Sequence, residues 1–118
     1  MKNIDQIIKT LTLDEKVSLL SGFNSWYTSK IEKKNVPSIK MSDGPNGVRG
    51  DSNSGKSSAC FPCAISIGST WDLPLIKNIG IALGEEALAK DVDVLLGPTI
   101  NIHRHTLGGR HSQSFSED

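Results

Sequence analysis

Hydrophobic residues near the start of the chain recur at the spacing of short amphipathic helices. The first stripe follows the i, i+3, i+4, i+7 pattern and consists of Ile4, Ile7, Ile8 and Leu11. Thr12 and Glu15 then have the spacing of a capping box, and Gly22 is suited to end a helix at positive φ. The pattern predicts two short helices in succession over residues 4–22.

A longer helix is predicted in the second half of the chain. Thr70 or Asp72 can cap it, and Pro74 falls in its first turn, where a missing N–H costs little. Gly80 and Gly84 are expected to allow close packing against a neighbouring strand. The expected buried face of this helix is made by Leu75, Ile76, Ile79, Leu83, Ala87 and Leu88.

Short apolar runs on either side of this helix are typical of strands. We expect strands over residues 37–41, 61–69 and 92–96, with a long loop over residues 42–60. The order of strand, loop, strand, helix and strand predicts an α/β protein with a parallel sheet. No further helix follows to cover the last strand, so Val92, Val94 and Leu96 are expected to lie uncovered.

Composition and charge exclude several classes of protein. The 118 residues contain 13 basic and 13 acidic side chains, which gives no excess charge for binding nucleic acid or a membrane surface. The sequence contains no run long and apolar enough for a transmembrane helix and no signal-peptide core. We therefore expect a cytoplasmic protein, or one exported by a route that the sequence does not display, of one domain or part of one.

Residues Gly50–Ser57 satisfy the phosphate-loop pattern G-x-x-x-x-G-K-S. A phosphate loop must leave a strand directly and open a helix, whereas here the expected strand ends well before Gly50 and Pro62 follows soon after. A small phosphate- or nucleotide-binding module is kept as an alternative function.

Cys60 and Cys63 have the C-x-x-C spacing of redox sites and zinc knuckles. Redox use requires a helix after the motif, and the sequence predicts a strand there. His103 and His105 lack the usual zinc spacing, so a zinc site of two cysteines and two histidines is conceivable but unsupported, and we expect incidental thiols.

Two polar loops follow expected strands and carry the stronger functional signal. The first, over residues 42–50, contains Asp43 in a Gly/Pro-rich turn and Arg49 six residues later. The second, over residues 96–110, ends at Arg110. Because loops at the carboxyl ends of parallel strands converge, these side chains are suited to binding the hydroxyls of a sugar. An Asx turn in which Asp43 only caps its own backbone is the alternative.

These loops, together with motifs between them, resemble the glycoside hydrolase family 3 β-glucosidases. The resemblance extends over essentially the whole chain in the family's order. Its motifs are Met41–Arg49, Phe61-Pro62 with Thr70-Trp71-Asp72, Gly84–Ala87 with Lys90, Leu95–Pro98 with Asn101-Ile102, and Leu107–Arg110 with Ser114–Asp118.

The resemblance implies an α/β fold that is about the first third of a TIM-like (β/α)8 barrel, with residues 1–118 as the truncated N-terminal part of the family's N-terminal domain. It implies that Asp43 and Arg110 bind the terminal glucose, and that Arg49 shapes the loop or pairs with the carboxylate. The implied activity is retaining hydrolysis of terminal β-D-glucosyl residues, without cofactors.

The resemblance also implies that the chemistry needs residues outside this chain. Retaining hydrolysis uses a nucleophile and an acid/base carboxyl, and both are expected beyond Asp118. We therefore expect the chain alone to be inactive, to have uncovered apolar faces, and either to stand alone or to complement the missing remainder of the barrel as a sugar-binding partner.

The chain departs from the family pattern near its end. Thr106 replaces a proline, and His111-Ser112-Gln113 replaces a typical Asn-Phe-Glu. A freer loop and less packing beneath Arg110 are the expected consequences. Which glycoside is cleaved is left open, because the resemblance extends to enzymes acting on several sugars.

Overall fold

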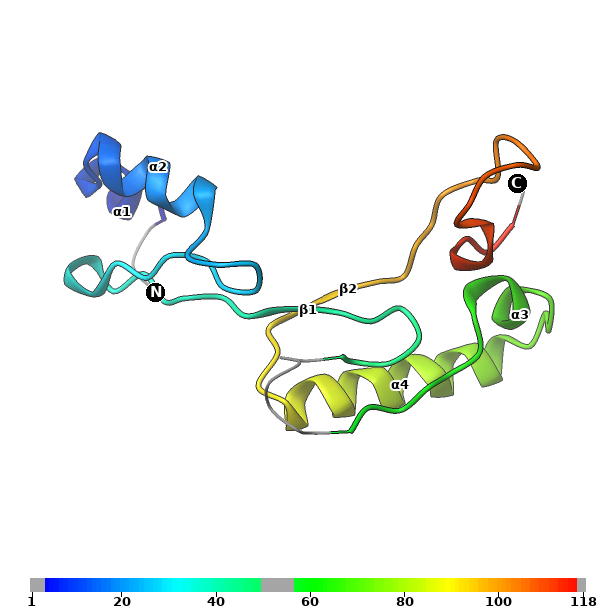
Figure 1. The fold of residues 1–118 in the computed structure, drawn as a ribbon. Coiled ribbons are helices and arrows are strands. Elements are labelled where there is room, and N and C mark those ends of the chain that lie inside the picture. Colours follow the sequence, from blue (N-terminus) through cyan, green and yellow to red (C-terminus); the bar gives the residue numbers. More distant parts are fainter. Residues whose placement is uncertain (1–3, 50–56, 117–118) are drawn as a thin grey trace. The chain divides into compact units, whose positions relative to one another are not determined.

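The computed structural model describes residues 4–49 and 57–116 and divides into two compact units, Met1–Met41 and Ser42–Asp118. The first unit contains helices α1 (Ile4–Thr10) and α2 (Leu13–Ser21) and the 3₁₀ turn η1 (Glu32–Lys34). The second contains helices α3 (Ala64–Gly68) and α4 (Leu73–Ala89) and the 3₁₀ turn η2 (His111–Gln113) (Figure 1). Strand β1 (Met41–Asp43) begins at the boundary between the units, and β2 (Val94–Leu96) lies in the second.

The two predicted N-terminal helices are confirmed. Thr12 Oγ1 accepts from the Glu15 N–H and the Glu15 carboxylate accepts from the Thr12 N–H, which completes the capping box. Gly22 follows α2 with φ of 74°, as expected for a residue that takes the chain out of a helix.

The strand expected over residues 37–41 begins later, at Met41, and ends at Asp43. Residues before it form only isolated antiparallel bridges, Tyr27 with Lys40 and Ile31 with Val36. The reason lies in side-chain hydrogen bonds that interrupt regular pairing: Ser38 Oγ donates to the Thr28 carbonyl, and the Ile39 N–H donates to Thr28 Oγ1.

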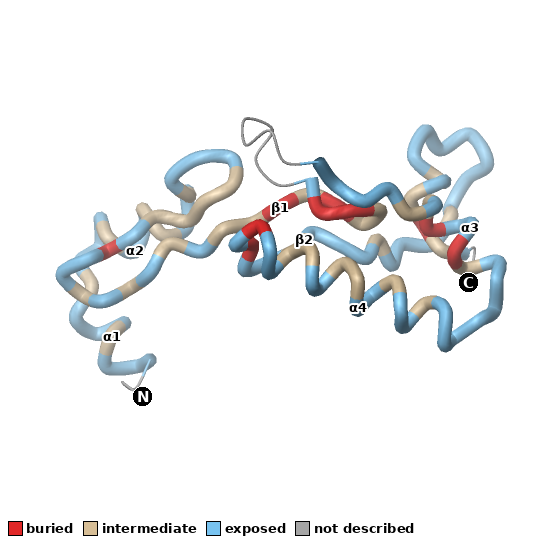
Figure 2. Tube along the Cα trace, turned by 90° about the horizontal axis from the view of Figure 1, so that it is seen from below, coloured by how far each residue is buried: buried red, intermediate tan, exposed pale blue. Residues whose placement is uncertain are grey.

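In the second unit, β1 and β2 are neighbours in one two-stranded sheet and run in the same direction (Figure 1). Helix α4 connects the two strands and lies alongside them in both views (Figures 1 and 2). Asp72 Oδ1 accepts from the Leu75 N–H at its start, and Pro74 lies in the first turn. The predicted helix and last strand are therefore confirmed, and the described residues form an α/β unit.

The strand expected over residues 61–69 is wrong, because this segment contains helix α3. A short apolar run has no periodicity that separates a buried strand from one helical turn. Ala64 and Ile67, spaced three apart, are the buried residues of α3, and Phe115 lies close to Gly68. Tertiary packing against the segment around η2 selects the helix.

The expected buried face of α4 is also wrong in part. No α4 residue is buried; Leu75 and Leu88 are 43% and 77% exposed. Gly80 and Gly84 have open space where a Cβ would lie, so they make no close approach to a strand. The remaining four expected residues are half-buried and line an apolar hollow of about 340 Å³, namely Ile76, Ile79, Leu83 and Ala87.

The small core of this unit contains Val48, Ala64, Ile67 and Val92. Val92 was expected to be uncovered and is 7% exposed, whereas Val94 and Leu96 are exposed as expected (Figure 2). The difference arises because Val92 precedes β2 and its N–H donates to the Ala87 carbonyl at the end of α4. Within the described parts of the chain, no helix is both long and apolar enough to cross a membrane.

Candidate functional site

The three residues expected to bind substrate line one cavity of about 450 Å³ in the second unit. Asp43 is the last residue of β1, Arg49 comes from the loop after β1, and Arg110 comes from the segment after β2. The rest of the lining consists of Gly44, Pro45, Asn46, Gly47, Ser58, Ala59, Cys60, Leu96, Thr99 and Gln113. Two segments that are far apart in sequence therefore place one aspartate and two arginines around the same space.

The loop from Asp43 to Arg49 is closed by its own backbone. The Arg49 N–H donates to the Asp43 carbonyl at 3.0 Å, and the Gly47 N–H donates to the Gly44 carbonyl at 3.4 Å. Gly44 and Gly47 have φ of 147° and 155°, and a Cβ at either would lie 1.8 Å from a backbone carbonyl oxygen. Only glycine fits these two positions, so the sequence Gly-Pro-Asn-Gly sets the shape of this wall.

Asp43 presents its carboxylate to the cavity, while its backbone carbonyl accepts from Ser42 Oγ and from the Arg49 N–H. Among the described residues, neither an ion pair nor a side-chain hydrogen bond holds the carboxylate, and no Asx turn forms. Arg49 is exposed, and the described residues show no ion pair between its side chain and Asp43. Its backbone N–H closes the loop, which agrees with the expected role in shaping the loop.

Arg110 is held next to Gln113 by the one-turn helix η2. The Gln113 N–H donates to the Arg110 carbonyl at 3.1 Å, and Arg110 Nε donates to Gln113 Oε1 at 2.8 Å. Residues three apart eclipse each other in a 3₁₀ turn, which brings these side chains together. The rings of His103 and His111 stack with their centroids 4.6 Å apart. The reduced packing expected beneath Arg110 stays a prediction.

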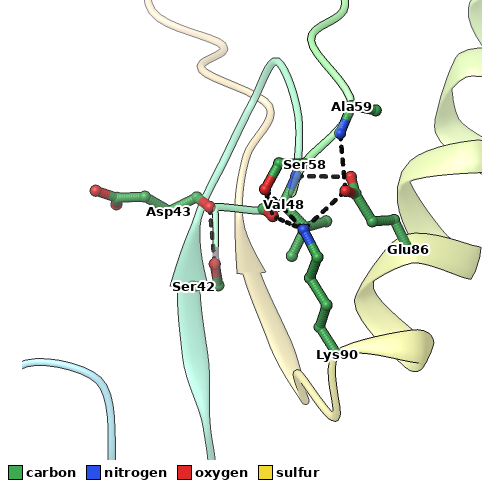
Figure 3. Close-up of polar contacts among 7 residues, drawn as sticks. All are labelled: Ser42, Asp43, Val48, Ser58, Ala59, Glu86 and Lys90. Carbon is green, nitrogen blue, oxygen red and sulfur yellow. Dashed lines mark hydrogen bonds and ion pairs between the residues drawn. The ribbon is translucent and has the colours of Figure 1, made fainter. Parts of the chain in front are cut away.

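A largely buried ion pair lies behind the loop that follows Asp43 (Figure 3). Lys90 Nζ and Glu86 Oε1 are 2.8 Å apart, and their side chains are 8% and 16% exposed. Glu86 accepts from the backbone N–H groups of Val48 and Ala59, both at 2.9 Å. Burial alone would raise the pKa of Glu86, but these hydrogen bonds and the Lys90 ammonium lower it below its ordinary value, so the carboxylate is ionised at neutral pH.

The C-x-x-C residues contribute free thiols. Cys60 is exposed and lies on the cavity wall, and Cys63 directly precedes α3. The hydrogen bond with Ser66 lowers the pKa of the Cys63 thiol. The segment after Cys63 forms a five-residue helix and not the expected strand. The expected strand was the argument against a redox function of the two cysteines, so that argument is wrong. The helix by itself supplies neither a redox partner nor a substrate.

The histidines do not form a metal centre with other ligands: over residues 4–49 and 57–116, no three His, Cys, Asp or Glu side chains are grouped to hold an ion. A hollow of about 560 Å³ near Asn101, Arg104 and His105 has no acidic residue in its lining. The cavity around Asp43, by contrast, is lined by an aspartate and two arginines.

The phosphate-loop alternative falls on Gly50–Ser57, of which only Ser57 lies within the described residues. Ser57 is exposed, and residues 57–63 contain no helix; the next helix begins at Ala64. The described surroundings thus lack the helix start that would hold phosphates.

The sequence did not predict the contacts that three residues of this region make, namely Glu86, Lys90 and Gln113. Glu86 and Lys90 have the i,i+4 spacing of an ordinary surface pair, and the family motif that contains them was given no role for either residue. Their contacts reach residues 27 to 42 positions away, which no local pattern indicates. The contact between Gln113 and Arg110 could have been predicted from their spacing of three residues, but only if the 3₁₀ turn had also been predicted.

Parallel strands, a crossover helix and a polar cavity at the ends of both strands define an α/β unit (Figure 1). Comparison with known proteins specifies the family. The family model described as "Glycosyl hydrolase family 3 N terminal domain" matches residues 2–118, and the chain belongs to this family.

Similar proteins include full-length enzymes of several organisms. A probable β-glucosidase I of Emericella nidulans is 50% identical and a β-glucosidase of Rhizobium radiobacter 53% identical, each over 98% of this chain and 14% of the relative. The crystal structure of the Kluyveromyces marxianus β-glucosidase in complex with glucose has a TM-score of 0.90 and 44% identity, over 98% of this chain and 14% of that one. The chain thus spans about one seventh of the length of these relatives.

Proposed function

We propose that this chain is the glucose-binding part of a β-glucosidase that releases terminal, non-reducing β-D-glucosyl residues with retention of configuration. The observation that carries the proposal is the meeting of Asp43, Arg49 and Arg110 around one cavity. The carboxylate of Asp43 accepts hydrogen bonds from neighbouring sugar hydroxyls, and the guanidinium of Arg110 donates to hydroxyl oxygens. Arg49 completes the loop that holds Asp43.

Catalysis in this proposal requires groups from outside residues 1–118. A retaining glycosidase needs two carboxyl groups about 5–5.5 Å apart. The described lining of the cavity contains one carboxylate, that of Asp43, which we assign to substrate binding. The nucleophile and the acid/base are therefore supplied by another part of a longer polypeptide or by a separate chain.

We further propose that β1, α4 and β2 are the first elements of a (β/α)8 barrel. Two observations support this arrangement: the strands are parallel and joined through a helix, and large apolar side chains of the same unit, including Leu88 and Ile100, lie exposed at 77% and 84%. In a complete barrel, further strands and helices bury such surfaces. A separately encoded remainder would co-purify with this chain.

The test is a hybrid enzyme in which residues 1–118 replace the matching segment of the Rhizobium radiobacter β-glucosidase, to which the chain is 53% identical. We expect the hybrid enzyme to hydrolyse p-nitrophenyl β-D-glucoside, and proton NMR to show β-glucose as the first product. The 118-residue chain alone is expected to give no turnover. A folded hybrid enzyme without β-glucosidase activity would contradict the proposal.

Substitutions in the hybrid enzyme test the assigned residues. Each hydrogen bond to a charged group contributes about 1.5–3 kcal/mol, so Asp43→Asn should lower kcat/KM by about 10- to 150-fold. The matched control is Asp91→Asn, an exposed aspartate just after α4 at φ of 54°, where asparagine is equally tolerated. Equal losses in both variants would remove Asp43 from the site.

A further inference from the structure

Glu86 lies in the last turn of α4 and Lys90 directly follows the helix, and neither residue belongs to the cavity lining. Both are nevertheless polar groups with little exposure in a unit with a small apolar core. A buried ion pair is a poor source of stability, because desolvation offsets most of the attraction and apolar residues of the same size do as well or better. What such a pair supplies is directional hydrogen bonding.

The hydrogen bonds of the pair converge on two backbone segments. The Glu86 carboxylate accepts from the N–H groups of Val48 and Ala59, and Lys90 Nζ donates to the Val48 carbonyl and to Ser58 Oγ. Val48 is therefore held at both its N–H and its carbonyl, and its side chain is fully buried. Ser58 Oγ also donates to the Val48 carbonyl, which ties the two segments to each other.

These two segments are walls of the sugar-binding cavity. Gly47 and Arg49 flank Val48 and line the cavity, as do Ser58 and Ala59 themselves. The Arg49 N–H in turn holds the Asp43 carbonyl. Figure 3 shows the Asp43 carboxylate pointing away from Glu86 and Lys90, so the pair acts on the loop from behind and leaves the carboxylate open to the cavity.

We propose that Glu86 and Lys90 are positioning residues of the sugar site, which set the place of Asp43 and Arg49 by fixing Val48 and its neighbours against α4. This inference rests on the proposed function. It predicts that a change in the pair alters the affinity of the cavity for sugar, and not merely the amount of folded protein. A misplacement of about 1 Å in a binding group can cost about 100-fold in rate.

The experiment uses the hybrid enzyme with Glu86→Gln, which keeps the size of the side chain. The substitution replaces one acceptor oxygen by an NH₂ group, which would face a backbone N–H that also donates. We expect KM for p-nitrophenyl β-D-glucoside and Ki for glucose to rise together, by about 10- to 100-fold. The matched control is Glu85→Gln on the same helix, which is exposed and should leave both constants unchanged.

Lys90→Met is the second variant, because it removes the donors without leaving a charge in their place. KM and Ki should rise in the same direction as in Glu86→Gln. Both constants are independent of the concentration of active enzyme, so partial unfolding does not imitate this result. Normal KM and Ki in both variants, with or without a lower melting temperature, would overturn the positioning role while the proposed function stands. An inactive but folded parent hybrid enzyme would refute both.

Discussion

Gly44→Ala is the sharpest perturbation of the loop that carries Asp43. A Cβ at this position would lie 1.8 Å from the Gly47 carbonyl oxygen, 2.7 Å from the Gly47 carbonyl carbon and 3.0 Å from the Val48 Cα. All three neighbours are backbone atoms, so no flexible side chain can move aside. Val48 is moreover fixed through its N–H and carbonyl by Glu86 and Lys90, which prevents the turn from opening as a unit.

The magnitude follows from these contacts. An ordinary contact begins at 3.4 Å and the Cβ would lie 1.8 Å from the Gly47 oxygen, so the turn must shift by about 1.6 Å. This shift breaks the weak Gly47-to-Gly44 hydrogen bond and strains a residue at φ of 147°. Backbone strain of this kind costs about 1–3 kcal/mol. Displacement of Asp43 by the same shift should lower kcat/KM of the hybrid enzyme by about 100-fold.

The assay combines denaturant unfolding with kinetics on p-nitrophenyl β-D-glucoside. Gly109→Ala is the matched control, because it precedes Arg110 in the other loop and has open space at the Cβ position. We expect Gly109→Ala to leave kcat/KM within a few-fold of the parent. If Gly44→Ala has parental stability and kcat/KM, the loop does not position Asp43 and the reasoning fails.

Three further predictions concern other parts of the structure. Gly80→Ala should stabilise the isolated chain by about 0.5–1 kcal/mol, because the added Cβ meets no atom and alanine has the better helix propensity. The same substitution should destabilise the hybrid enzyme if further barrel elements pack on this face of α4. Equal effects on the urea unfolding of both proteins would contradict the barrel arrangement. The pKa of Glu86 is lowered from 4.5 on folding, so ionisation of this carboxyl stabilises the fold above pH 4.5. The contribution is lost as the pH falls through the lowered pKa. Unfolding free energies of the hybrid enzyme, measured between pH 3 and pH 6, should show this loss in the parent and a shallower decline in Glu86→Gln. Thr12→Ala removes the capping box and should reduce the stability of the first unit by about 1 kcal/mol. The measurement is the helical circular dichroism of residues 1–41. Ser21→Ala, at a nearby exposed position, should change this stability little.

Local rules were sufficient for the elements whose signals lie within a few residues. The Thr12–Glu15 capping box, the Asp72 cap with Pro74, and the apolar run at β2 are each defined by neighbours in sequence, and the structure contains all of them. The polar residues of the two loops could be proposed as site residues for a similar reason, because loops at the carboxyl ends of parallel strands meet whatever their sequence.

Local rules failed where long-range contacts decide. Ala64–Gly68 is helical because Ala64 and Ile67 are buried and Gly68 lies against Phe115, a contact 47 positions apart that no window of the sequence contains. The hydrophobic spacing predicted a buried face on α4, but no residue of α4 is buried. Burial depends on which elements cover the helix, and the spacing of hydrophobic residues does not indicate these elements.

The sequence by itself determined the helices with caps, the glycine-dependent turn after Asp43 and the family to which the chain belongs. Only the tertiary structure decided that Asp43, Arg49 and Arg110 line one cavity and that Glu86 and Lys90 hold the wall behind it. The physical reason is that caps and turns are satisfied by hydrogen bonds to near neighbours, whereas a buried ion pair finds its partners only after the chain has folded and removed water from around it.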